Sequence, residues 1–145
     1  MTRPLQVDPR GLRFSAALTS VVLAAALLAP RPAALALLAA QALVFAAGAS
    51  GRFDLSPYGR LFARVLRPRL GPPAELEDAR APQFAQGVGL TFTLVAVVAL
   101  AAGLDVVGLV ATGFALVAAL LNAVVGFCLG CETYLVLRRL APVRA

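Results

Sequence analysis

The fold is decided by residues 12–49, which read LRFSAALTSVVLAAALLA (12–29), PRP (30–32) and AALALLAAQALVFAAGA (33–49). Each apolar run is at the short end of the length that an α-helix needs to cross a bilayer. Pro30 and Pro32 end the first run, because proline lacks a backbone N–H and disfavours helical geometry in the residue before it. Since so short a turn joins antiparallel neighbours, the stretch predicts a transmembrane helical hairpin in preference to a cleaved signal peptide.

Two further apolar runs follow a more polar central loop over residues 50–83. Hydrophobic residues make up 61% of the chain and charged residues 14%, whereas soluble domains carry about 25% charged residues. Too little polar surface is available to cover a soluble core, so the surrounding solvent must be the lipid bilayer. We therefore expect one domain, an all-α integral membrane protein with four transmembrane helices at residues 12–29, 33–49, 84–104 and 106–137.

The arginines predict the orientation in the membrane. The chain has 13 basic residues, and all of them are Arg. All but Arg31 fall in the N-terminal arm, the central loop or the C-terminal tail, which four spans place on one side. By the positive-inside rule, we expect a multi-pass protein of a bacterial cytoplasmic membrane with both termini in the cytoplasm. The net charge of +6 is thereby explained by membrane anchoring, without a nucleic-acid partner.

The central loop contains a candidate amphipathic helix. The dipeptide SP at 56–57 is typical of a helix start, and PRLGPP at 68–73 is typical of a helix end. Between them, three arginines recur at helical spacing. They are Arg60, Arg64 and Arg67. We expect a short interfacial helix whose arginines contact lipid phosphates or help to dock a partner, with a solvated loop as the alternative.

The fourth apolar run is too long for one span. Residues 106–137 would form a straight helix of about 48 Å, whereas the hydrocarbon core is about 30 Å thick. The helix either tilts and protrudes or breaks, and GFCLGC at 126–131 is the best place for a break because glycine permits non-helical backbone. Gly126 and Gly130 are also spaced for close helix packing, which is the structural alternative.

Cys128 and Cys131 form a Cys-x-x-Cys motif at this candidate break. Residues at i and i+3 share a helix face, so one thiol can attack a disulfide and the other can resolve it. A helix that restarts near Gly126 would stabilise a thiolate on Cys128 through its dipole, and Glu132 is a candidate proton carrier. In the reducing cytoplasm we expect no permanent disulfide. Two cysteines that only pack as small hydrophobes are the alternative.

The cysteine pair predicts no bound cofactor and no metal. Glu132 stands where a c-type haem motif has histidine. A zinc site needs about four ligands, and the chain has two cysteines and no histidine. The sequence also lacks the histidine of a catalytic triad and a glycine-rich phosphate loop.

Two polar side chains fall inside the predicted spans. Asn122 lies one turn before the candidate break, and Gln41 lies in the second apolar run. Polar side chains in a membrane hydrogen-bond to neighbouring helices, so we expect Gln41 to be a partner of Asn122.

Three motifs carry a family resemblance: VDPRGLRF at 7–14, RPRLGPP at 67–73 and GFCLGCE at 126–132. Together they resemble an uncharacterised bacterial membrane family, domain of unknown function 4395. Further matching positions are Glu75, Asp78, Phe84 to Gln86, Leu121 to Ala123, and Tyr134. The resemblance covers residues 7–138 and implies a membrane protein without an established activity.

The resemblance also suggests a chemical context. Relatives in this family look like neighbours of thiosulfate sulfurtransferases and thioredoxin-like proteins. The GFC at 126–128 followed by Tyr134 is similar to the end of small membrane domains attached to rhodaneses, although the segment GCET at 130–133 is extra here.

Three functions are compatible with these patterns. The first is a membrane thiol-redox or sulfur-handling protein that uses Cys128, Cys131 and Glu132, with a thioredoxin-like or rhodanese-like cytoplasmic partner. The second is a small transporter of a sulfur species or another anion, which would need a homo-oligomer because four short spans enclose little space. The third is an assembly subunit without chemistry. Whether the protein is an enzyme stays open at this point.

Overall fold

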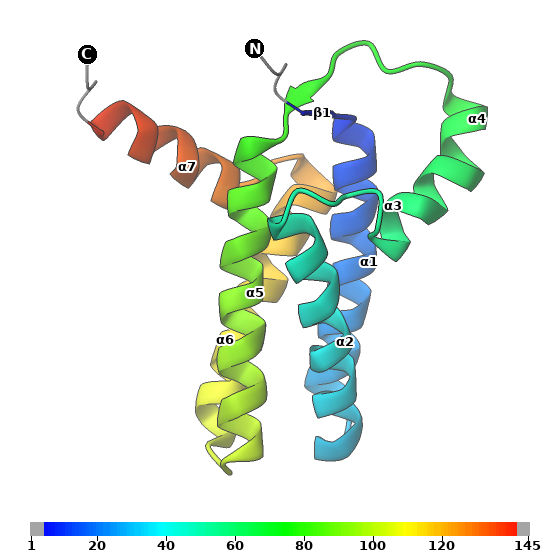
Figure 1. The fold of residues 1–145 in the computed structure, drawn as a ribbon. Helices are drawn as coiled ribbons and strands as arrows, with labels where there is room; N and C mark the ends of the chain where they lie inside the picture. Colours follow the sequence, from blue (N-terminus) through cyan, green and yellow to red (C-terminus); the bar gives the residue numbers. More distant parts are fainter. Residues whose placement is uncertain (1–4, 142–145) are drawn as a thin grey trace.

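The fold is described by a computed structural model over residues 5–141 (Figure 1), so Arg3 and Arg144 of the basic termini lie outside the described residues. Four helices are long and apolar enough to cross a membrane. They are α1 (Pro9–Leu28), α2 (Arg31–Ala49), α5 (Arg80–Ala101) and α6 (Asp105–Leu120), the last extended by a π-helical turn, η2 (Leu121–Val125). The predicted all-α membrane protein is confirmed.

The helices begin slightly earlier than hydropathy predicted, because their first turns contain charged residues and prolines that lie outside the apolar runs. Asp8 is the N-cap of α1 and accepts a hydrogen bond from the Arg10 backbone N–H at 2.9 Å, with Pro9 in the first turn. Helix α2 begins at Arg31 and carries Pro32 in its first turn, where the missing N–H does no harm.

The four long helices form a closed ring in which α1 packs against α2, α2 against α5, α5 against α6, and α6 against α1. Its core is built from small residues and a few leucines. They are Leu23, Ala26, Ala34, Leu38, Ala96, Leu100, Ala111 and Ala115. Small residues let helix backbones approach closely, which is how helices associate where lipid competes for apolar contact.

One end of the bundle holds the two tight turns that join α1 to α2 and α5 to α6 (Figure 1). Arg31 of the first turn forms a salt bridge with Asp105 of the second turn. Both side chains are about half exposed, so the pair contributes at most about 1 kcal/mol. The salt bridge nevertheless fixes which turn lies beside which.

The other end holds the first described residues, the central segment and the last helix (Figure 1). Here a two-residue strand, β1 (Gln6–Val7), pairs antiparallel with β2 (Glu77–Asp78). This ribbon was not predicted, because neither strand is long enough to show alternation. It ties the start of α1 to the end of the central loop.

The helix predicted in the central loop is present as three consecutive pieces: α3 (Pro57–Leu61), the π-helical turn η1 (Phe62–Leu66) and α4 (Arg67–Leu70). The predicted start at Ser56-Pro57 is confirmed. The prediction that Pro68 helps to end the helix is wrong, since the chain stays helical to Leu70 and leaves at Gly71 with φ of 71°. A π turn before Pro68 widens the helix where the proline ring would clash with a preceding carbonyl.

The central segment is attached to the bundle by aromatic side chains. Phe62 is buried and lies against Phe14 of α1, with ring centroids 5.8 Å apart. The Tyr58 hydroxyl donates to the Gln41 side-chain oxygen at 2.8 Å. Partial burial raises the pKa of Tyr58, which keeps this hydroxyl protonated as the donor.

The fourth apolar run does not form one helix over 106–137. It divides into α6 with η2 and a separate helix, α7 (Leu129–Leu140), with a break at residues 126–128. The break occurs where the excess length and the glycines predicted it. Helix α7 points away from the bundle (Figure 1) and carries exposed apolar side chains, Leu129, Val136, Leu137 and Leu140.

Candidate functional site

The break between η2 and α7 is made by Gly126, which adopts φ of 76° and ψ of 14° in the left-handed region. Only glycine enters this region without strain from a Cβ atom. The turn closes two hydrogen bonds, from the Gly126 N–H to the Asn122 carbonyl (3.0 Å) and from the Phe127 N–H to the Leu121 carbonyl (3.2 Å). Gly126 therefore stops the membrane-spanning helix.

Arg13 occupies the end of the stopped helix. Its guanidinium donates to the carbonyl of Ala123 at 3.3 Å and to that of Val124 at 3.1 Å. These carbonyls lie in the last turn of the helix. They have no intrahelical partners, because the N–H groups that would pair with them in a continuous helix lie beyond the break. Sequence analysis missed this role, because contacts across 110 residues leave no local signal and Arg13 was interpreted only as part of a basic arm.

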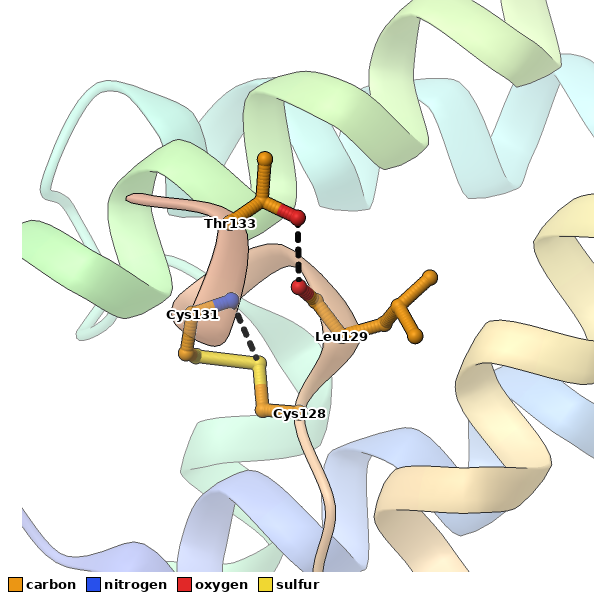
Figure 2. The surroundings of a disulfide bond; sticks show 4 residues. All are labelled: Cys128, Leu129, Cys131 and Thr133. Atoms are coloured by element: carbon orange, nitrogen blue, oxygen red, sulfur yellow. Dashed lines mark hydrogen bonds between the residues drawn. A yellow bond between two sulfur atoms is a disulfide. The ribbon is translucent and has the colours of Figure 1, made fainter. Parts of the chain in front are cut away.

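Helix α7 begins directly at the cysteine motif. Cys128 is its N-cap, and its Sγ accepts a hydrogen bond from the Cys131 backbone N–H at 3.3 Å (Figure 2). In the same turn, the Thr133 hydroxyl donates to the Leu129 carbonyl at 2.8 Å. Of the two alternatives, a continuous tilted helix and a broken helix, the structure has the broken one, and the break places Cys128 at the positive end of the new helix.

The two sulfur atoms are joined in a disulfide, with the Cα atoms 5.2 Å apart (Figure 2). Helical geometry over the motif brings the Cα atoms within the normal range for a disulfide. The sequence analysis expected no permanent disulfide, and the structure shows the oxidised form of the pair. The prediction that the pair alternates between dithiol and disulfide stays a prediction.

The start of α7 is fixed against α5 by close contact. A Cβ atom on Gly130 would lie 2.7 Å from both Cα and Cβ of Ala85, so only glycine fits there. One turn later, the rings of Tyr134 and Phe84 lie 5.7 Å apart, and the Arg138 guanidinium lies 5.9 Å from the Tyr134 ring. Gly130 thus has the predicted packing role, but Gly126 lies outside the helix and does not share its face.

The cysteines are partly exposed at this end of the bundle, and both have intermediate burial. Glu132 is exposed, and its backbone N–H donates to the Cys128 carbonyl at 3.0 Å. Among the described residues its carboxylate forms no hydrogen bond with either sulfur, so its role as proton carrier stays a prediction.

The predicted pairing of Asn122 with Gln41 is wrong. The Gln41 amide is buried and donates to the Thr19 hydroxyl at 3.2 Å, while its oxygen accepts from Tyr58. Asn122 is partly exposed in η2. Because both ends of the Gln41 amide already have partners on α1 and α3, the side chain is not available to a distant turn.

The three arginines of the central segment are exposed, and the structure does not bring them to the cysteines. Arg60 donates to the Asp54 carbonyl at 2.8 Å, close to its own helix. Helices α4 and α7 extend on opposite sides of this end of the bundle (Figure 1). Arg64 and Arg67 lie with Arg60 on the α4 side, so this group does not line the cysteine site.

A second arginine of α1 holds the central segment. The Arg10 guanidinium pairs with Asp8 at 2.9 Å and donates to the carbonyls of Leu70 (3.4 Å) and Gly71 (2.9 Å), where α4 ends. This hydrogen-bonded pairing with Arg10 lowers the pKa of Asp8 against the opposing effect of burial. Asp8 is therefore a carboxylate at neutral pH and keeps Arg10 in position.

The described residues contain no group of three or more His, Cys, Asp or Glu side chains that could hold a metal ion.

Two open grooves of about 370 Å³ and 360 Å³ lie along α5. The first is lined by apolar residues of α5 and α6 with Thr91, and the second by residues of α2 and α5 with Gln83. Neither groove includes the cysteines.

A model of the family described as Domain of unknown function (DUF4395) matches residues 7–139. No curated protein matches the chain. No solved structure matches it either.

Proposed function

The chain belongs to the family described as Domain of unknown function (DUF4395), and from its site we propose that it is a membrane-bound thiol–disulfide exchange protein. The observation that carries the proposal is the position of Cys128 as the N-cap of α7, bonded to Cys131 and accepting its N–H. Cysteines at helix N-termini in Cys-x-x-Cys motifs form reactive thiolates. Two cysteines that served only as small hydrophobic packing residues would not need to cap a helix or to be partly exposed.

In the reduced protein, the Cys128 thiolate attacks one sulfur of a partner's disulfide. One S–S bond forms as the partner's bond breaks, and the partner's second sulfur leaves as a thiolate that takes up a proton. The Cys131 thiol then loses its proton, to water or to Glu132, and attacks the Cys128 sulfur. The partner leaves as a dithiol that has gained the two electrons lost by the Cys128–Cys131 pair.

The partner we propose is a cytoplasmic thioredoxin-like or rhodanese-like protein. Support comes from the gathering of the central segment, the start of α1 and α7 at one end of the bundle (Figure 1), because these segments carry every described arginine except Arg31. The positive-inside rule assigns this end to the cytoplasmic side of a bacterial inner membrane. Since Arg60, Arg64 and Arg67 lie on the α4 side, we assign them to lipid phosphates rather than to partner docking.

Trapping of mixed disulfides in native membranes tests the proposal. In a Cys131→Ser variant, the Cys128 thiol can attack but is not released by its neighbour, so we expect a covalent adduct with a soluble thiol protein that reductant removes. The Cys128→Ser variant is the matched control and should trap much less. A membrane-impermeant alkylating reagent, applied to each face, should reach both reduced thiols from the cytoplasmic face only.

The opposite result supports an assembly role. If both thiols stay reduced and unreactive in every condition, the motif serves only to pack α7 against α5, through the contact of Gly130 with Ala85. A stable complex that survives the replacement of both cysteines by alanine would then identify the subunit partner.

A further inference from the structure

We propose that Arg13 is a positioning residue for Cys128, and this inference rests on the proposed thiol–disulfide exchange. Arg13 lies in the second turn of α1, far from the motif in sequence. Its guanidinium reaches the last turn before the break and lies next to Gly126, where an added Cβ would be 3.7 Å from Cζ and Nε of Arg13. Arg13 of α1 therefore lies beside Gly126, two residues before Cys128.

The carbonyl groups at the helix end show why an arginine is needed. The carbonyls of Leu121 and Asn122 receive the N–H groups of Phe127 and Gly126. Those of Ala123 and Val124 receive the Arg13 guanidinium instead. Carbonyls at a helix end lack intrahelical N–H partners and must be satisfied by side chains or water, and Arg13 supplies this donor from α1.

The consequence for the cysteine follows from the rigidity of the connection. Only Phe127 separates Gly126 from Cys128, and Gly130 is pressed against Ala85 immediately afterwards. With Arg13 holding one side of the break and Ala85 the other, the Cys128 sulfur is kept at the first N–H groups of α7. The positive charge of Arg13, next to Gly126 and two residues before Cys128, also favours an anionic sulfur.

The test compares Arg13→Gln and Arg13→Lys with the parent, in detergent-solubilised full chain equilibrated with mixtures of reduced and oxidised glutathione. Loss of the hold on Cys128 removes stabilisation of the reduced thiolate. We therefore expect R13Q to shift the dithiol–disulfide equilibrium toward the disulfide by about tenfold, with a matching fall in the alkylation rate of reduced Cys128. Lysine keeps the charge but not the planar fork, so R13K should shift the equilibrium in the same direction by a smaller amount, about threefold from the parent.

The control is Arg69→Gln, which removes the same charge from the same end of the bundle. Within residues 5–141 the Arg69 side chain forms no hydrogen bond or salt bridge, so R69Q should keep the parent equilibrium. A merely structural role for Arg13 would lower the thermal stability of R13Q and leave the equilibrium unchanged, and this outcome overturns the inference. If R13Q does not accumulate in folded form, R13K decides, and an R13K equilibrium equal to that of the parent overturns it.

The two proposals fail separately. A parent protein that exchanges disulfides normally while R13Q behaves like the parent removes only the role of Arg13. A parent protein that never forms a mixed disulfide with a protein thiol, while R13Q still shifts the glutathione equilibrium, removes the proposed function and leaves the positioning role in place.

Discussion

The described part of the chain contains two π-helical turns of five residues each, η1 in the central segment and η2 at the end of α6, and they end differently. After η1 the helix continues through Pro68, whereas after η2 it stops at Gly126. Proline fixes φ near the helical value, while glycine allows a positive φ. The comparison teaches that a π-helical turn alone does not end a helix, and that the left-handed conformation of Gly126 does.

The two helix ends are nevertheless held in the same way, by arginines of α1. Arg10 donates to the carbonyls of Leu70 and Gly71 at the end of α4, and Arg13 donates to those of Ala123 and Val124 at the end of η2. Both arginines lie in the first two turns of α1. The start of α1 therefore holds both irregular helices, although only one of them leads to cysteines.

The largest effect should come from Gly126→Ala. A non-glycine residue in the left-handed region loses about 1–2 kcal/mol, so we expect the free energy of unfolding to fall by about this amount. Thermal unfolding of the detergent-solubilised protein measures it. Gly113→Ala is the matched control, because a Cβ there meets nothing within 4 Å and the residue lies inside α6. Equal stabilities of the two variants would show that Gly126 is not where the helix must stop.

A smaller effect, about 1 kcal/mol at pH 7, is expected for Asp8→Ala, which removes the N-cap of α1 and releases Arg10. Because the pKa of Asp8 is lowered in the folded protein, its stabilisation is present above the ordinary pKa of aspartate and is lost as the pH falls through the lowered pKa. The stabilities of D8A and the parent should therefore converge below about pH 4.

Asp78→Ala provides the comparison for that pH dependence. The pKa of Asp78 is also lowered, by hydrogen bonding to Arg80, but both side chains are largely exposed and do not contact α4. We expect a weaker loss of stability in D78A. A loss of stability in D78A equal to that in D8A would mean that the contact of Arg10 with the end of α4 does not contribute to the stability of the fold.

The smallest effect is expected for Pro68→Ala. The new N–H group can donate to a helix carbonyl, which stabilises the fold, but the unfolded chain gains conformational freedom. These effects oppose each other, so we expect a change of less than about 0.5 kcal/mol in the free energy of unfolding. A change as large as that of Gly126→Ala would contradict the view that η1 already accommodates the proline.

The sequence predicted those features that depend on composition and local geometry. Hydropathy located the four long helices, and excess length together with glycine located the break at Gly126. The start of the central helix followed from Ser56-Pro57. These signals are local, because each lies within one or two turns of the feature that it predicts.

Features that depend on distant contacts were not predictable in this way. The partners of Gln41 are Thr19 and Tyr58, and only the fold brings the three side chains together. Nothing in the sequence distinguishes Arg10 and Arg13 from the other arginine of the N-terminal arm. Their hydrogen-bond acceptors are backbone carbonyl groups, which every residue has. The motif itself identified Cys128, but its position as a helix N-cap needed the observed break.

The salt bridge between Arg31 and Asp105 has an electrical consequence. With the orientation proposed above, both turns must be carried across the membrane as the protein inserts. Moving one charge through a membrane potential changes the free energy by about 2.3 kcal/mol per 100 mV. Because one turn carries a positive charge and the other a negative charge, moving both turns across the membrane transfers no net charge, and the potential does no net work on this pair.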